Sequence, residues 1–148
     1  MSGDISRLFG RAVETMLTAA LPAHVTVYYA QVTDDPPVMP YVVVWVIPAM
    51  RRRANLTGTI ASPDSRVQLT GVGRSPDEVT WVLDHAGDAL HGQRPDLGEG
   101  WRSGLIWEMP IARAVTKNED LWWDGQPTYR GVSMFRLSAE PAPVPAGS

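Results

Sequence analysis

The sequence contains no cysteine and only one lysine, Lys117. Without cysteine the chain has no disulfide framework, no thiolate nucleophile and no cysteine-ligated metal site, which suits a reducing compartment. No apolar run approaches the ~20 residues that a membrane-spanning helix needs, and the first residues do not resemble a signal peptide. We therefore expect a soluble protein, made inside the cell, with no membrane partner.

The sequence also lacks a strong excess of charge of one sign. Its 148 residues carry a formal net charge of −3 and have a pI near 5.5, which argues against binding duplex nucleic acid through bulk electrostatics. The local exception is Arg51-Arg52-Arg53. With 44% hydrophobic residues, the chain is long enough for one ordinary core, so we expect a single domain over residues 1–139.

Two segments predict amphipathic helices. One runs from Asp4 or Ser6 to Leu21, with apolar residues at i, i+3, i+4 and i+7 spacing. The other begins at Ser75, which can accept a hydrogen bond from the backbone of Glu78 while the Glu78 side chain reaches back, and it continues to Leu90. Each helix has a single apolar stripe, which must lie against a sheet.

Alternating apolar and polar residues predict strands at residues 25–29, 66–70, 105–115 and 129–139, and Pro110 points to an edge or a bulge. Tyr41 to Ile47 is apolar throughout, so this strand is either central under the helices or buried against another chain. Trp45, Trp81 and Trp107 lie in predicted elements, where core packing is the default interpretation. The order helix-strand-strand-strand-helix-strand-strand predicts an α+β domain with a mainly antiparallel sheet of about five strands and two helices on one face.

Residues 48–64 predict a long arm between two strands that form a hairpin. A loop of this length is uncommon in a compact domain and tends to be functional or disordered. Met50, Arg51, Arg52 and Arg53 lie at its base. The arm is either a mobile solvated loop or a contact with a partner chain or nucleic acid, and we select these four residues as candidate protein-interaction residues.

Residues 116–128 predict a second loop, with its turn at Asp124-Gly125. Trp122 and Trp123 lie near its tip. Exposed tryptophans are typical contact anchors, so these two residues are candidates for protein interaction, with packing back onto the sheet as the alternative. Residues 140–148 are rich in Pro, Ala, Gly and Ser and predict a disordered tail.

No motif predicts catalysis. His85, Asp88 and His91 lie three apart on the second predicted helix, so they diverge around it and favour a solvated face over a metal site. The acidic residues show no spacing that fixes two carboxylates on one wall of a cleft. Gly71-Val72-Gly73 lacks the third glycine of a dinucleotide site and the lysine of a P-loop. We expect no catalytic residue, no cofactor and no metal.

Four segments together form a recognisable pattern. They are the opening amphipathic helix, the strand at residues 28–32 that leads through proline-rich turns into residues 40–44, the strand–helix unit from Val67 to Leu90, and the closing strand from Thr128 to Leu137. Across residues 4–139 the chain resembles the tail terminator proteins, also called tail completion proteins, of long-tailed bacteriophages.

The resemblance implies a structural virion protein of the tail, assembled in the host cytoplasm and without enzymatic activity. It implies a ring, a homohexamer, that caps the tail tube, ends tail elongation and provides the head-joining surface. Its partners would be other copies of itself, the tail tube protein and the head–tail connector protein, with DNA only as passing cargo. The arginine cluster and the tryptophan pair match no family motif, so their proposed roles come from the residues alone.

Other classes of function remain open at this point. A head-closure or connector protein of the neck would share the virion location and the ring assembly. A small nucleic-acid-binding module would use the arginine arm and the nearby aromatic residues. A small hydrolase using His85 or His91 is the least favoured alternative.

Overall fold

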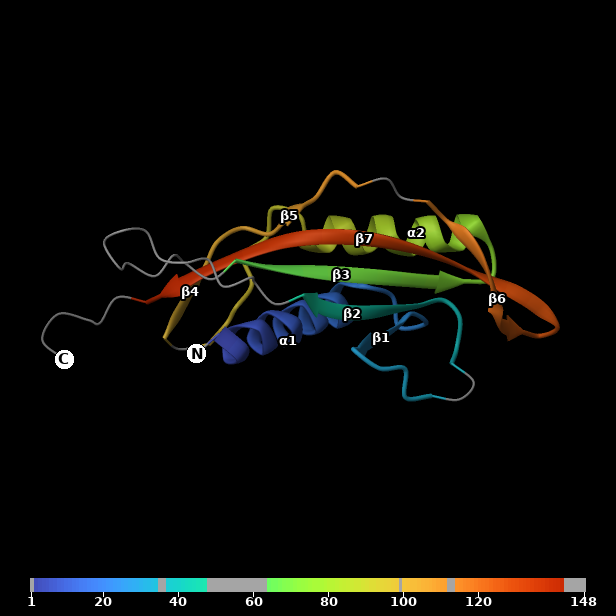
Figure 1. The fold of residues 1–148 in the computed structure, drawn as a ribbon, viewed down its shortest axis with the longest axis horizontal. Helices are drawn as coiled ribbons and strands as arrows, with labels where there is room; N and C mark the ends of the chain where they lie inside the picture. Colours follow the sequence, from blue (N-terminus) through green and yellow to red (C-terminus); the bar gives the residue numbers. More distant parts are fainter. Residues whose placement is uncertain (1, 35–36, 48–63, 99, 112–113, 143–148) are drawn as a thin grey trace, which may run out of the picture.

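The fold consists of two layers, a sheet and a pair of helices. The computed structural model describes residues 2–34, 37–47, 64–98, 100–111 and 114–142. Within these ranges, helices α1 (Ser2–Ala20) and α2 (Pro76–Leu90) pack on a sheet of seven strands (Figure 1). The strands are β1 (Thr26–Tyr29), β2 (Tyr41–Ile47), β3 (Asp64–Gly73), β4 (Trp101–Ser103), β5 (Trp107–Glu108), β6 (Thr116–Trp123) and β7 (Gln126–Pro141).

The long strands β3 and β7 form the centre of the sheet and extend along most of the molecule (Figure 1). The sheet continues from β3 to β2 and β1, whereas β4, β5 and β6 each pair with the other edge of β7. All these pairs are antiparallel except β1 with β2, which is parallel. The predicted α+β class and mainly antiparallel sheet are therefore confirmed, while the parallel pair and two further strands were not predicted.

Both helices cover the same face of the sheet, as predicted. One buried cluster joins the apolar stripes of α1 and α2 to alternate residues of the central strands, including Phe9, Val13, Val44, Leu69, Val82, Leu83, Phe135 and Leu137. Gly71 and Gly131 are paired across β3 and β7 beneath α2. A Cβ on Gly131 would lie 3.1 Å from side-chain atoms of Val79 and Leu83, so this pair of glycines allows α2 to approach the sheet closely.

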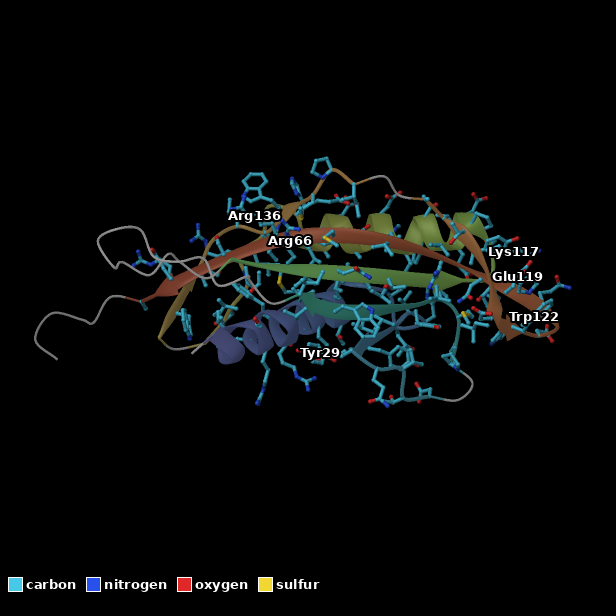
Figure 2. All side chains as sticks on the ribbon, viewed as in Figure 1. Tyr29, Arg66, Lys117, Glu119, Trp122 and Arg136 are labelled. Atoms are coloured by element: carbon cyan, nitrogen blue, oxygen red, sulfur yellow. The ribbon has the colours of Figure 1, made fainter. Side chains whose placement is uncertain are left out.

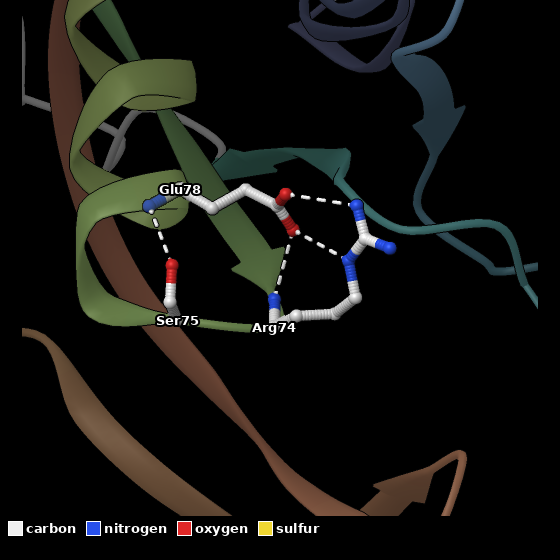
Figure 3. A network of polar contacts seen from close by, with 3 residues as sticks. All are labelled: Arg74, Ser75 and Glu78. Carbon is white, nitrogen blue, oxygen red and sulfur yellow. Dashed lines mark hydrogen bonds and ion pairs between the residues drawn. The ribbon is translucent and has the colours of Figure 1, made fainter.

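The start of α2 has the predicted cap (Figure 3). The Oγ of Ser75 accepts a hydrogen bond from the backbone N–H of Glu78 at 3.1 Å. The Glu78 side chain reaches back one residue beyond the cap, where it accepts from the backbone N–H of Arg74 at 2.9 Å and pairs with the Arg74 guanidinium at 3.2 Å. These contacts satisfy donors that the first helical turn leaves without partners, and they place Arg74 at the end of β3.

The predicted strand over residues 105–115 is wrong, because only Trp107 and Glu108 pair as β5. The backbone N–H of Met109 still donates to the carbonyl of Met134 at 2.8 Å. Pro110 has no N–H to donate, so the ladder stops there. Residues 112–113 lie outside the described part of the chain.

The predicted loop over residues 116–128 is also wrong, because it contains β6 and forms a hairpin with β7. The turn does lie at Asp124-Gly125, as predicted, with φ values of 53° and 75° that suit a two-residue hairpin turn. β6 is an edge strand, and its polar residues are mostly exposed and show no alternation. β4 lies where the sequence predicted a loop. Glu140 and Pro141, the last residues of β7, lie where it predicted a tail.

Candidate interaction surfaces

The sheet face opposite the helices carries exposed apolar side chains. Trp45 and Ile47 on β2 are 42% and 40% exposed. The strand register places Trp45 next to Gln68, which pairs with Met134, and places Ile47 next to Arg66. Residues that pair across strands point to the same face, so these side chains form one surface. We define the open-face patch as Trp45, Ile47, Arg66, Gln68, Met134 and Arg136.

Trp45 and Trp107 are not core residues, and this prediction was wrong. Trp107 is 53% exposed at the edge of the sheet, where it pairs in register with Arg136 and its ring contacts His91 edge to face at 5.3 Å. Trp81 packs against the core, as predicted. The sequence contained one signal for the exposed face, the unbroken apolar run of β2. This run had two interpretations, and one of them was burial against another chain.

The two tryptophans of the β6–β7 hairpin have different environments. Trp122 is 59% exposed. Trp123 is partly buried, because it packs on the small cluster around Tyr28 and Tyr41 and lies 5.3 Å from the Arg74 guanidinium in a cation–π contact. We had two alternatives for this pair, exposure for protein contact or packing back onto the sheet. Trp123 packs back onto the sheet, whereas Trp122 presents its ring to solvent.

Acidic residues lie close to Trp122 in the sequence of the hairpin. The β6 register shifts between Asn118 and Trp122, so the intervening residues leave the ladder with β7. Glu119, Asp120 and Asp124 are all exposed. We define the acidic hairpin patch as Glu119, Asp120, Trp122 and Asp124. Lys117 is an exposed basic residue just before the patch, so the patch carries three negative charges beside one positive charge.

The structure places only some of the predicted contact residues. Met50, Arg51, Arg52 and Arg53 lie outside the described residues, which end at Ile47 in β2 and resume at Asp64 in β3. Ile47 pairs with Arg66 at this end of the two strands. The hairpin lies at the opposite end, as Figure 2 shows for Glu119 and Trp122 relative to Arg66 and Arg136.

A small second cluster supports the sheet below the hairpin. It is formed by Tyr28, Met39, Tyr41, Val43 and Val72, and its two tyrosine rings meet edge to face at 5.5 Å. The phenol of Tyr28 donates a 2.5 Å hydrogen bond to the carboxylate of Asp34. Burial, followed by the hydrogen bond and the negative charge of Asp34, raises the pKa of Tyr28 to about 12. Both tyrosines are therefore neutral structural groups at physiological pH.

The titratable side chains considered for catalysis have structural roles. His85 donates its Nδ1–H to the carbonyl of Trp81 at 2.8 Å, and His91 accepts from the backbone N–H of Glu108 at 3.0 Å. In the described ranges, no three His, Asp or Glu side chains gather in a way that could hold a metal. No helix of this part of the chain is long and apolar enough to cross a membrane.

The fold has known counterparts, although no protein-family model and no curated protein matches the sequence. One solved structure with this fold is a chain from the virion of a native gene transfer agent particle, with a TM-score of 0.63 and 16% identity. The match covers 93% of the present chain and 98% of that chain. A second solved chain has a TM-score of 0.55 and 17% identity, with coverage of 97% and 99%. The chain therefore shares a fold with a protein of a gene transfer agent virion.

Proposed function

We propose that this chain is a structural virion protein that forms a ring on the end of a tail tube, ends tail elongation and provides the surface for joining the head. The observation that carries the proposal is the open-face patch, which exposes Trp45 and Ile47 on the sheet face opposite the helices. The fold shared with a virion protein over 93% of the chain supports it.

Exposed aromatic surface on a protein is unfavourable in water. Contiguous exposed apolar side chains on a soluble domain mark contact surfaces, and tryptophan is enriched among residues that dominate binding energy. Here Trp45 is exposed on the open face of the sheet, and Trp122 is exposed on the β6–β7 hairpin. Two different patches on one chain suit a head-to-tail contact, and such contacts close into rings when the rotation between copies allows it.

The partners follow from this role. Other copies of the chain would form the ring, which we expect to be a hexamer, and its two sides would meet the tail tube protein and the head–tail connector protein. We place the arm, from Met50 to Ser62, against the tail tube or a neighbouring copy. The single domain would thus use its strands for the ring and the arm for a second contact.

Deletion and complementation in the phage or particle that encodes the chain tests the proposal. Without the protein, we expect tails of abnormal length that do not join heads, as seen by electron microscopy. Wild-type protein restores normal particles, whereas replacement of Arg51, Arg52 and Arg53 by alanine does not. Normal tails in the deletion strain would refute the capping role, and full rescue by the triple alanine variant would refute the role of the arm.

A neck protein of the head-closure or connector type is the main alternative, since it would use the same surfaces for a ring at another level of the particle. Gold labelling of a tagged chain on separated heads and tails distinguishes the two. Label on the end of free tails supports the tail-capping role, and label confined to heads supports the alternative.

Nucleic-acid binding is favoured by one observation, the presence of arginines and exposed tryptophans on the same sheet. Arg66 and Arg136 lie between Ile47 and Trp107 in one row across β2, β3, β7 and β5, and Trp45 lies two residues before Ile47 on β2. Bases stack on aromatic rings while basic side chains contact the phosphates. A gel shift with single-stranded DNA that weakens steeply with salt would support this function.

A further inference from the structure

We propose that the acidic hairpin patch of one copy docks on the open-face patch of a second copy, head to tail. The inference deepens the proposed function, on which it rests for the closure of the ring. The contact itself can be tested without tails or heads. Its occupant is a second copy of this chain, because the two surfaces of the chain match each other in charge and in apolar content.

The charges of the two patches are complementary. Arg66 on β3 pairs in register with Arg136 on β7, so both arginines belong to the open face. A carboxylate from a second copy is attracted to the positive charge of this face. Glu119 and Asp120 supply carboxylates on a segment that has left the ladder and extends into solvent.

The apolar groups also match. Trp122, 59% exposed, is the large apolar side chain of the acidic hairpin patch. On the open face, Ile47 pairs in register with Arg66, and Met134 lies two residues before Arg136 on β7, so an indole ring would find apolar side chains beside the two arginines. A central tryptophan surrounded by charged pairs is a common arrangement at strong protein contacts.

The position of the two patches requires a second molecule. Glu119 and Trp122 lie at one end of the molecule, and Arg66 and Arg136 lie well away from them (Figure 2). The hairpin therefore contacts a neighbouring open face and not its own. The segment 48–63 of the same chain does not match in charge, because it contains three arginines and no Asp or Glu.

Reciprocal charge reversal tests the contact by light scattering coupled to size exclusion. Wild-type protein should associate as its concentration rises. The variant Arg66→Glu, and the double variant Glu119→Arg with Asp120→Arg, should each weaken association at least tenfold. An equimolar mixture of the two should regain it, because each hairpin then meets a side chain of opposite charge at position 66. The triple variant should regain association alone.

The controls reverse single charges at other exposed sites. Arg7→Glu on α1 and Asp88→Arg on α2 should associate like wild type. Circular dichroism and thermal unfolding show that each variant folds. Because the native chain has no cysteine, a pair of introduced cysteines gives an independent measurement. Gln68→Cys with Gln126→Cys should form ladders with a short bis-maleimide linker, whereas neither single variant should exceed a dimer.

Three results would overturn the inference: a strictly monomeric wild type without ladders, unchanged association of Arg66→Glu, or a mixture that fails to regain association. Binding of single-stranded DNA that depends on Arg66 but not on the hairpin acids would assign the open face to nucleic acid instead. The inference and the proposed function can fail separately. If the mixture regains association but the protein never caps tails, the contact stands and the proposed function fails. If Arg66→Glu caps tails normally, the contact is refuted and the proposed function stands.

Discussion

Arg66 and Arg136 occupy directly opposed positions on β3 and β7, both on the sheet face that the helices leave uncovered. A sheet can tolerate such a pair, but it has a cost, because like charges at opposed positions destabilise two paired strands by ~0.2–1 kcal/mol.

Reversal of one of these charges should change stability and assembly in opposite directions. We expect Arg66→Glu to raise the free energy of unfolding of the monomer by about 0.2–1 kcal/mol, because a repulsive cross-strand pair becomes attractive. Urea unfolding at low protein concentration measures this change, and Arg7→Glu on α1 is the matched control. A loss of stability on Arg66→Glu would show that the in-chain contacts of these arginines outweigh their repulsion.

The two hairpin tryptophans should respond differently to truncation. Trp122→Ala should change the free energy of unfolding by less than about 0.5 kcal/mol, because the ring is exposed. Trp123→Ala should cost about 1–3 kcal/mol, because it removes packing on the Tyr41 cluster and the cation–π contact with Arg74. On ring formation the tryptophan fluorescence should shift in wild type and less so in Trp122→Ala. An unchanged wild-type spectrum would argue against a buried Trp122.

Tyr28 should make the protein less stable in alkali. Its pKa is raised from 10.0 to about 12 in the folded chain, so the folded state holds the phenolic proton more tightly than the unfolded chain does. The resulting stability is complete below pH 10 and is lost as the pH rises toward about 12, at ~1.4 kcal/mol per unit. Unfolding midpoints measured from pH 9 upward should fall less in Tyr28→Phe. Identical slopes would rule out this coupling.

Two buried serines should differ in what their hydroxyls contribute. Ser133 Oγ is buried on the core face without a hydrogen-bond partner among the described residues. Ser103 Oγ donates to the carbonyl of Pro95 at 2.7 Å. Ser133→Ala should therefore leave stability unchanged or raise it by about 1 kcal/mol, whereas Ser103→Ala should cost about 1–3 kcal/mol. Equal costs in thermal unfolding would show that Ser133 has a partner after all.

Much of the fold could be predicted from the sequence, because its main elements are amphipathic or strongly apolar. The α1 stripe, the cap at Ser75 and the apolar run from Tyr41 to Ile47 each leave a local pattern that tertiary contacts reinforce. β4, β5 and β6 leave no such pattern. They are short or exposed edge strands held by pairing with β7, and that pairing is not visible in their own residues.

The candidate surfaces could be predicted only in part. Trp122 was selected correctly as an exposed residue, because the Asp124-Gly125 turn marks the tip of its hairpin. Trp45 and Trp107 were assigned to the core, because residue type alone does not reveal which face of a sheet lacks a second layer. That face becomes identifiable only when both helices are seen to pack on the other side.

The position of β7 in the chain sets an order for folding. β7 pairs with β3, β4, β5 and β6, and all four are synthesised before it. Until β7 leaves the ribosome, one edge of β3 remains open and the three short strands have no ladder to join. Unpaired edges of this kind promote aggregation, and long-range strand pairing is slow. Nonsense or frameshift changes early in β7 should therefore yield insoluble chains and not shortened but functional ones.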